Sequence, residues 1–391
     1  MSYKVAMSSP DLSEVERQAV AEVLQTPRLS MGPRLESFEG AIADRLGLRH
    51  AIAVNSGTAG LHLCVRAAGI GAGDAVITSP FSFVASSNVL LYERAVPIFV
   101  DIDPVTGNLD PAQVAAAAAD LAQGGRRAER WLPRSGAEGW TSLRGLLTVD
   151  VFGQPADHDP LAATAHQHGL TLIEDSCEAL GASYKGRPAG TLGDIAVFAF
   201  YPNKQITSGE GGMVVTERDD LASMVRALRN QGRAPGDTWL DHTFLGYNYR
   251  MDELNAALGH AQMTRLDELL DKREAVAGWY AARLASIPGV EAPVVVPSTT
   301  RMSWFVYVVR FDPGIDRDAL IHRLDQEGIP SRPYFKPIHL QPYVQQRFGT
   351  QAGDFPVAED LGARGLALPF SGVMRQDEVA LVCDILRRVI G

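Results

Sequence analysis

The chain has 391 residues, of which 46% are hydrophobic and 21% are charged, and its formal net charge at pH 7 is -10. This composition is that of an ordinary soluble globular protein, and the length is enough for two domains, or for one large domain with a smaller one. The negative charge argues against nucleic acid or an acidic membrane surface as the main partner. It does not argue against an anionic small ligand, because backbone amides can hold one.

Cysteine usage and the N-terminal sequence indicate the compartment. The three cysteines stand far apart without metal-type spacing, and their odd number argues against a disulfide framework. They are Cys64, Cys177 and Cys383. No apolar run near the N-terminus has the length of a signal peptide, and none elsewhere has the length of a membrane helix. We therefore expect a cytoplasmic protein with neither a metal site nor a membrane segment.

Strand-like and helix-like segments alternate as far as about residue 215. Buried strands are expected over residues 50–54, 75–79, 96–101, 143–151, 170–175 and 195–200. Helices are expected over residues 13–25, 38–46, 61–68, 85–92, 111–123 and 160–168. This alternation predicts an α/β fold with a mostly parallel, doubly wound sheet. No strand turn carries the glycine spacing of a dinucleotide fold, which argues against a nicotinamide dehydrogenase.

The pattern changes after Thr216. Helices are expected over residues 221–230, 251–285, 317–327 and 376–389, with a strand over 305–311 and a proline-rich stretch over 330–342. This composition is typical of a smaller α+β domain. We expect an N-terminal arm and a large domain over residues 1–262, and an interdomain helix with the small domain over residues 263–391. A polar, basic excursion over residues 124–142 is expected on the surface.

The stretch AVFAFYPNKQITSGEGG, residues 196–212, carries the strongest candidate for chemistry. An apolar run breaks there into a turn, so Lys204 is presented just beyond a strand end. A lysine amine held in such a place can lose its proton and form a Schiff base. The alternative is an exposed lysine in a turn.

A second candidate lies in the turn after the strand expected over residues 50–54. Small residues there lead into a helix, so free amides, the helix dipole and the hydroxyls of Ser56 and Thr58 together form a candidate anion site. A capping turn without a ligand explains the same residues equally well.

Two further residues complete the set. Asp175 ends a strand and shares a sheet edge with Lys204, where a carboxylate can keep the ring nitrogen of a pyridine cofactor protonated. Phe83 follows another strand end and can lie on a flat ligand, although an aromatic there is more often core. The chain thus offers a candidate for each part of pyridoxal phosphate: its phosphate, its ring face, its ring nitrogen and its aldehyde.

Five motifs in order make the chain recognisable. They are NSGTAGLHL, PFSFVAS, IEDSCEALGA, AVFAFYPNKQITSGEGG and GYNYRMDELNAALG. The chain resembles the DegT/DnrJ/EryC1/StrS family of pyridoxal-phosphate sugar aminotransferases from about residue 29 to its last helix. The resemblance implies the type I aminotransferase fold and a homodimer with active sites at the subunit interface.

The resemblance also implies roles for single residues. Lys204 would form the Schiff base with the cofactor, Asp175 would pair with the pyridine nitrogen, and Phe83 would stack on the ring. The phosphate would be held by the anion turn and by one residue of the neighbouring subunit. These phosphate candidates are Ser56, Gly57, Thr58 and, from the neighbour, Asn248.

The family reaction moves an amine from an amino acid, usually L-glutamate, to the cofactor and then to a nucleotide-linked ketosugar. The last motif is closer to members that aminate carbon 4 of a 4-keto-6-deoxy sugar than to those that act at carbon 3, which stays as the alternative. The substrate candidates are Tyr247, Arg250, Lys336 and His339. A structural ion pair for Arg250 and a solvated histidine are the competing interpretations.

The chain departs from the family pattern at two site positions. Glu178 stands where the family usually has a glutamine beside the ring oxygen, so the carboxyl would have to share or donate a proton. Ala199 stands where many members have a phosphate-binding serine; the hydroxyls of Thr207, Ser208 or Ser56, or a water, are possible substitutes. A related dehydratase would lack the lysine, and a non-catalytic sensor or scaffold with the same fold is the alternative from another class.

Overall fold

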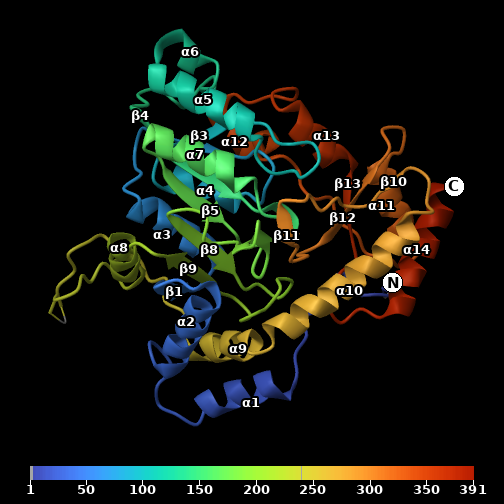
Figure 1. The fold of residues 1–391 in the computed structure, drawn as a ribbon, viewed down its shortest axis with the longest axis horizontal. Helices are drawn as coiled ribbons and strands as arrows, with labels where there is room; N and C mark the ends of the chain where they lie inside the picture. Colours follow the sequence, from blue (N-terminus) through green and yellow to red (C-terminus); the bar gives the residue numbers. More distant parts are fainter. Residues whose placement is uncertain (1–2, 239) are drawn as a thin grey trace.

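The computed structural model describes residues 3–238 and 240–391. A large α/β unit lies beside a smaller unit, and helix α10 (Leu266–Leu284) runs from one to the other (Figure 1). In the described residues, no helix is long and apolar enough to cross a membrane.

The centre of the large unit is a seven-stranded sheet in the order β1-β9-β8-β5-β4-β2-β3. Its strands are β1 (His50–Val54), β2 (Asp74–Thr78), β3 (Val96–Phe99), β4 (Ser142–Val149), β5 (Thr171–Asp175), β8 (Ile195–Ala199) and β9 (Gly212–Thr216). The four pairings from β8 to β3 are parallel, whereas β9 pairs antiparallel with both β8 and β1. The prediction of a mostly parallel sheet is confirmed; the antiparallel strand β9 was not predicted.

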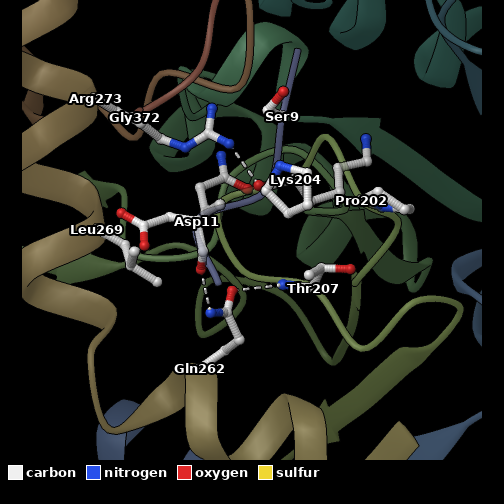
Figure 2. A pocket seen from close by; sticks show the side chains of 11 residues that line it. Ser9, Asp11, Pro202, Lys204, Thr207, Gln262, Leu269, Arg273 and Gly372 are labelled. Carbon is white, nitrogen blue, oxygen red and sulfur yellow. Dashed lines mark hydrogen bonds between the residues drawn. The ribbon is translucent and has the colours of Figure 1, made fainter. Parts of the chain in front are cut away.

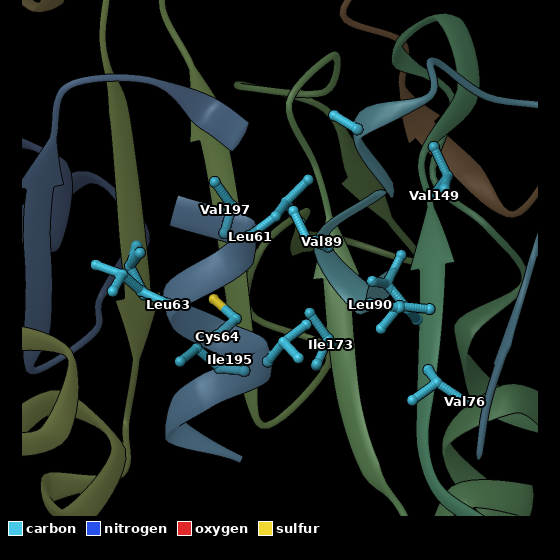
Figure 3. Packing of buried hydrophobic residues seen from close by; sticks show 14 of the residues in the cluster. Leu61, Leu63, Cys64, Val76, Val89, Leu90, Val149, Ile173, Ile195 and Val197 are labelled. Carbon is cyan, nitrogen blue, oxygen red and sulfur yellow. The ribbon is translucent and has the colours of Figure 1, made fainter. Parts of the chain in front are cut away.

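Helices cover both faces of this sheet, because most strand residues are apolar on both sides. They are α2 (Pro33–Leu46), α3 (Gly57–Ala67), α4 (Ala85–Tyr92), α5 (Pro111–Gln123), α7 (His158–His168), α8 (Asp219–Arg229) and α9 (Glu253–Met263). Helices α3, α4 and α8 pack on one face, whereas α2, α9, α5 and α7 pack on the other. Leu61 and Cys64 of α3 lie against Val197 and Ile195 of β8 (Figure 3). Helix α1 (Glu14–Val23), which Ser13 caps, packs along α9.

The smaller unit has its own core. A sheet of β10 (Val290–Glu291), β12 (Tyr307–Phe311) and β13 (Gly365–Leu368) packs with α10, α11 (Arg317–Gln326) and α14 (Gln376–Ile390). The remaining elements are β6 (Ser183–Tyr184), β7 (Arg187–Pro188), β11 (Thr299–Arg301), α12 (Pro342–Phe348), α13 (Pro356–Arg364) and the short 3-10 turns η1 (Val151–Gly153) and η2 (Ile338–Leu340).

Two sequence expectations differ from this arrangement. The single helix expected over residues 251–285 is broken at Thr264 and Arg265, where α9 ends and α10 begins. Val5 of the expected N-terminal arm is buried in the core of the smaller unit. The boundary between residues 262 and 263 stays a prediction.

The excursion over residues 124–142 lies on the surface, as expected, but it is packed in place. It begins with the short helix α6 (Gly125–Glu129). The indole N–H of Trp131 donates to Asp120 of α5 at 2.9 Å. Arg134 makes two hydrogen bonds, of 2.6 and 2.7 Å, to Asp354 beyond α12. The excursion therefore joins the large unit to the segment that follows α12.

Candidate active site

Lys204 lies in the loop that connects β8 to β9. Its Nζ is 3.5 Å from Glu178 Oε1 and 3.7 Å from the centroid of the Phe305 ring. Its side chain is only 13% exposed, so it is not the solvated turn lysine of the alternative interpretation. The amine is thus held between a carboxyl group and an aromatic face, and it remains within reach of a ligand.

Arg273 of α10 supports the backbone of this loop. One guanidinium nitrogen donates to the carbonyl oxygens of Lys204 at 2.5 Å and of Asn203 at 3.2 Å (Figure 2). The other donates to the carbonyls of Trp304 and Phe305. Burial lowers the pKa of Arg273 to about 10. Arg273 was not predicted as a site residue. It stands three residues from Leu270 and from Val276, among the buried positions of α10, but this spacing does not connect it to Lys204.

Asp175 ends β5 with its carboxyl group buried. Its Oδ2 accepts a hydrogen bond from the Ser86 hydroxyl at 2.6 Å, and its Oδ1 accepts one from the Cys177 amide at 3.3 Å. Burial raises the pKa of Asp175 above its ordinary value, and these two donors and the charge of Lys204 oppose that rise. Ser86 was not predicted as a site residue; it lies in α4, where a helix was expected.

Glu178 completes a group of three ionisable side chains. Its Oε2 accepts a hydrogen bond from the Phe152 amide at 2.9 Å, and its Oε1 faces Lys204. Burial raises the pKa of Glu178, whereas the charge of Lys204 lowers it. A carboxyl group in this setting can hold a proton and donate it to a ligand oxygen.

The anion turn meets the end of β8. Ser56 caps α3 by accepting a hydrogen bond from the Ala59 amide at 3.1 Å. A Cβ on Gly57 would lie 2.7 Å from the Cβ of Ala199, so only glycine fits where the turn passes the strand. The first amides of α3 have no partner within the helix. The turn is thereby placed at the same sheet edge as Lys204.

The substitutes proposed for a serine at position 199 are not equivalent. Thr207 donates to the carbonyl of Phe200 at 3.0 Å, and Ser208 donates to that of Glu210 at 2.7 Å. Within residues 3–238 and 240–391, the Ser56 hydroxyl donates to no group. Ser56 is therefore the best placed of the three to bind an anion.

Comparison with known proteins decides the family. The model of the DegT/DnrJ/EryC1/StrS aminotransferase family matches residues 10–387. The chain belongs to this family.

Individual relatives match this chain over almost its full length and over almost all of their own. GDP-perosamine synthase of Caulobacter vibrioides is 39% identical over 99% of this chain and 98% of the relative. A Bacillus subtilis protein described as the putative pyridoxal phosphate-dependent aminotransferase EpsN is 33% identical over 99% and 96%. The crystal structure of S. venezuelae DesV in complex with a ketimine intermediate has a TM-score of 0.86 and 32% identity, over 100% of this chain and 99% of that one. The chain is accordingly a pyridoxal-phosphate-dependent aminotransferase with the fold of this family.

Phe83 and Asn248, which family resemblance assigns to the cofactor, are both exposed. Phe83 is 62% exposed, and its carbonyl accepts a hydrogen bond at 3.3 Å from the same Ser86 hydroxyl that contacts Asp175. Ser86 thus links the backbone at Phe83 to the Asp175 carboxyl group. The carbonyl of Asn248 accepts a hydrogen bond from Asn55 of the same chain at 3.4 Å, which leaves its side chain on the surface.

Tyr247 and Arg250, on either side of Asn248, are engaged within the chain. The Tyr247 hydroxyl donates to Glu93 at 3.1 Å, and burial with the charge of Glu93 raises its pKa to about 12. Arg250 donates to Asn230 Oδ1 at 2.9 Å. Neither arrangement needs a substrate, so these contacts favour a structural role for both side chains.

Lys336 and His339 have opposite surroundings. Lys336 is exposed, and it stays a candidate for a negatively charged substrate. His339 is completely buried, with its Nε2 2.9 Å from Glu359 Oε1. It is not the solvated histidine of one interpretation, because its side chain is buried and its ring meets that of Phe355 edge-on, with the ring centroids 4.7 Å apart.

Proposed function

We propose that this aminotransferase transfers an amino group from L-glutamate to a nucleotide-linked ketosugar, at carbon 4 of a 4-keto-6-deoxy sugar. The observation that carries the proposal is the convergence of Lys204, Asp175 and the Gly57 turn at one sheet edge. The name of the 39% identical relative, GDP-perosamine synthase, supports a nucleotide-linked acceptor. Amination at carbon 3 is the alternative.

The residues present fit pyridoxal phosphate. Lys204 offers a nearly buried amine for the aldehyde, and Asp175 offers a buried carboxylate whose charged form is favoured by a cationic ring nitrogen. The Gly57 turn offers the first backbone amides of α3 and the Ser56 hydroxyl for the phosphate, and the exposed Phe83 offers a ring face. When bound, the cofactor acts as an electron sink that labilises a proton on the amino-bearing carbon.

The chain itself supplies the proton transfers. Lys204 would be the base that takes and returns the proton, because Arg273 fixes its loop and its amine is held between Glu178 and Phe305. Glu178 in its protonated form would donate a hydrogen bond to the cofactor's ring oxygen, as the family's glutamine amide would. Phe305 closes one side of the amine and keeps bulk water from it.

A homodimer is part of the proposal. Several large apolar side chains of the large unit are exposed, as expected of a surface that another subunit covers. They include Phe83, Tyr92, Tyr201 and Leu245. In that assembly Asn248 of each subunit reaches the phosphate of its neighbour. The three free cysteines fit a cytoplasmic location.

Absorption spectroscopy tests the reaction. The purified protein with pyridoxal phosphate should show a lysine-bound cofactor band that borohydride fixes and that excess L-glutamate converts to the amine form. GDP-, UDP- and dTDP-linked 4-keto-6-deoxy sugars should then restore the band, and matched 3-keto sugars should not. A band that glutamate leaves unchanged would reject the donor, and restoration by 3-keto sugars alone would select the alternative.

A further inference from the structure

A second cluster of ionisable groups lies behind Asp175, and the proposed reaction does not use it. His158, at the start of α7, has its Nε2 3.1 Å from Asp150 Oδ1 and 3.8 Å from Glu174 Oε2. The side chains are 0%, 1% and 0% exposed, respectively. Asp150 follows β4, and Glu174 directly precedes Asp175 in β5.

The cluster is complete without a metal ion. Its ligand-type atoms lie within 4.8 Å of one another, a spacing that would also suit a metal. Glu174 already accepts hydrogen bonds from the amides of Gly190, Leu192 and Gly193. Asp150 accepts from the amide of Ala156 at 2.9 Å and from the Ser176 hydroxyl at 2.7 Å. Backbone and hydroxyl donors therefore occupy the oxygens that a metal would need.

His158 supplies the positive charge that two buried carboxylates require. Burial works against it, but the hydrogen bond to Asp150 and the charge of Glu174 raise its pKa, and the charge of Arg187 opposes them. The ring of Tyr184 meets the imidazole edge-on at 5.9 Å. The other ring nitrogen, Nδ1, has no hydrogen-bond partner in the described part of the chain.

Stability alone does not explain such a cluster. A buried ion network with an unpaired ring nitrogen is commonly no more stable than apolar residues of the same volume. What the cluster does is fix the backbone on both sides of Asp175. The Glu174 carboxyl group accepts a hydrogen bond from the Gly190 amide. The Asp175 carbonyl accepts one from the Asp150 amide at 3.1 Å, and the Ser176 hydroxyl donates one to the Asp150 carboxyl group.

Because successive side chains of a strand point to opposite faces of the sheet, fixing Glu174 and Ser176 also fixes the direction of the Asp175 side chain. Glu174 and Ser176 point to the α7 face of the sheet, so the Asp175 side chain between them points to the opposite face, where Ser86 and Phe83 lie. We propose that His158 is a positioning residue: by pairing with Asp150 and Glu174 it fixes the end of β5, and it thereby directs the Asp175 carboxylate at the ring nitrogen of the cofactor. The inference rests on the proposed role of Asp175.

A double-mutant cycle tests this, with affinity of the apoprotein for pyridoxal phosphate as the readout. His158→Leu should weaken binding by about tenfold, equivalent to about 1.4 kcal/mol. In an Asp175→Asn background the same substitution should weaken binding by less than about twofold, because the carboxylate through which it acts is gone. The pH titration of the lysine-bound cofactor band should shift in His158→Leu as it does in Asp175→Asn.

Controls separate positioning from general damage. His166→Gln changes an exposed histidine of the same helix and should leave affinity unchanged. If His158→Leu does not fold, His158→Gln, which keeps one donor, replaces it in the cycle. An equal loss in both backgrounds, or no loss in either, overturns the inference. If Asp175→Asn leaves the pH titration of the lysine-bound cofactor band unchanged, the role proposed for Asp175 itself is overturned.

Discussion

Two segments of similar composition have opposite surroundings in this protein. Residues 201–204 read Tyr-Pro-Asn-Lys, and residues 334–339 read Tyr-Phe-Lys-Pro-Ile-His, so each segment contains a tyrosine, a proline and a lysine. In the first, Lys204 is nearly buried against a carboxyl group. In the second, Lys336 is exposed and His339 is completely buried.

The anchors of the two segments explain the difference. The Lys204 loop leaves β8 at Ala199 and returns in β9 at Gly212, and these two residues are direct partners in the sheet. The other segment is held by distant parts of the chain: the Ile338 amide donates to the carbonyl of Pro80 at 2.7 Å, and the Thr350 hydroxyl donates to that of His339 at 2.6 Å. A strand end therefore predicts the place of a side chain, whereas contacts remote in sequence do not.

The largest expected effect is at Lys204. Replacing it with alanine should lower turnover by at least about a thousandfold, because the acid–base step alone commonly contributes two to four powers of ten. Steady-state kinetics would measure this, with Lys185→Ala, an exposed lysine paired with Asp159, as the matched control. Lys336→Ala should instead raise KM for the acceptor and leave the cofactor bound. Full activity in Lys204→Ala would contradict the mechanism.

Asp175→Asn should lower kcat by about a hundredfold to a thousandfold, since it removes the charge that stabilises a protonated ring nitrogen. The neutral amide still accepts from Ser86, so the fold should survive, which thermal unfolding would confirm. Activity within about threefold of wild type would remove Asp175 from the site.

His339→Ala should act on stability and not on catalysis. Loss of a buried ring bonded to Glu359 should lower the free energy of unfolding by about 2–3 kcal/mol, measured by urea denaturation. Burial lowers the pKa of His339, so the unfolded chain takes up the proton first as the pH falls. Its contribution to stability should therefore decline below the ordinary imidazole pKa. An altered KM with unchanged stability would restore His339 to the substrate site.

Glu178→Gln tests whether the carboxyl group beside Lys204 acts as a hydrogen-bond donor. An amide donates without titrating, so kcat at neutral pH should stay within about tenfold of wild type. Burial raises the pKa of Glu178, and the protonated form is the useful one, so wild-type activity should fall as the pH rises through that value. The glutamine variant should lack this limb of the pH–rate profile. An unchanged limb would assign the titration to another group.

The smallest expected effect is at the excursion. Arg134 is 54% exposed, so the solvent screens its ion pair, and Arg134→Ala should lower the free energy of unfolding only slightly. Activity should not change, because Asp354 lies outside the group around Lys204. Chemical denaturation with parallel kinetics would measure both quantities, and a large loss of kcat would mean that the excursion acts on the cleft.

A feature could be predicted from the sequence when the residues that form it lie close together in the chain. Strand β1 and helix α4 have the bounds expected, because their apolar runs are short and cleanly ended. The place of Lys204 at a strand end could also be predicted. Ser86 and Arg273 could not be assigned to the site, because each acts through a residue about 70 or more positions away. The burial of His339 depends on α12 and α13, neither of which shows a strong periodic pattern.

The edge position of β1 has a consequence for how the protein folds. Strand β8 and its partner β9 are close in sequence, so the lysine hairpin forms from local contacts, whereas β1, at the edge of the sheet, pairs with β9 across most of the large unit. Long-range contacts slow folding. The turn at Gly57 reaches Ala199 only when β1 docks. A cofactor whose phosphate bound this turn would therefore stabilise the docked position of β1 by mass action.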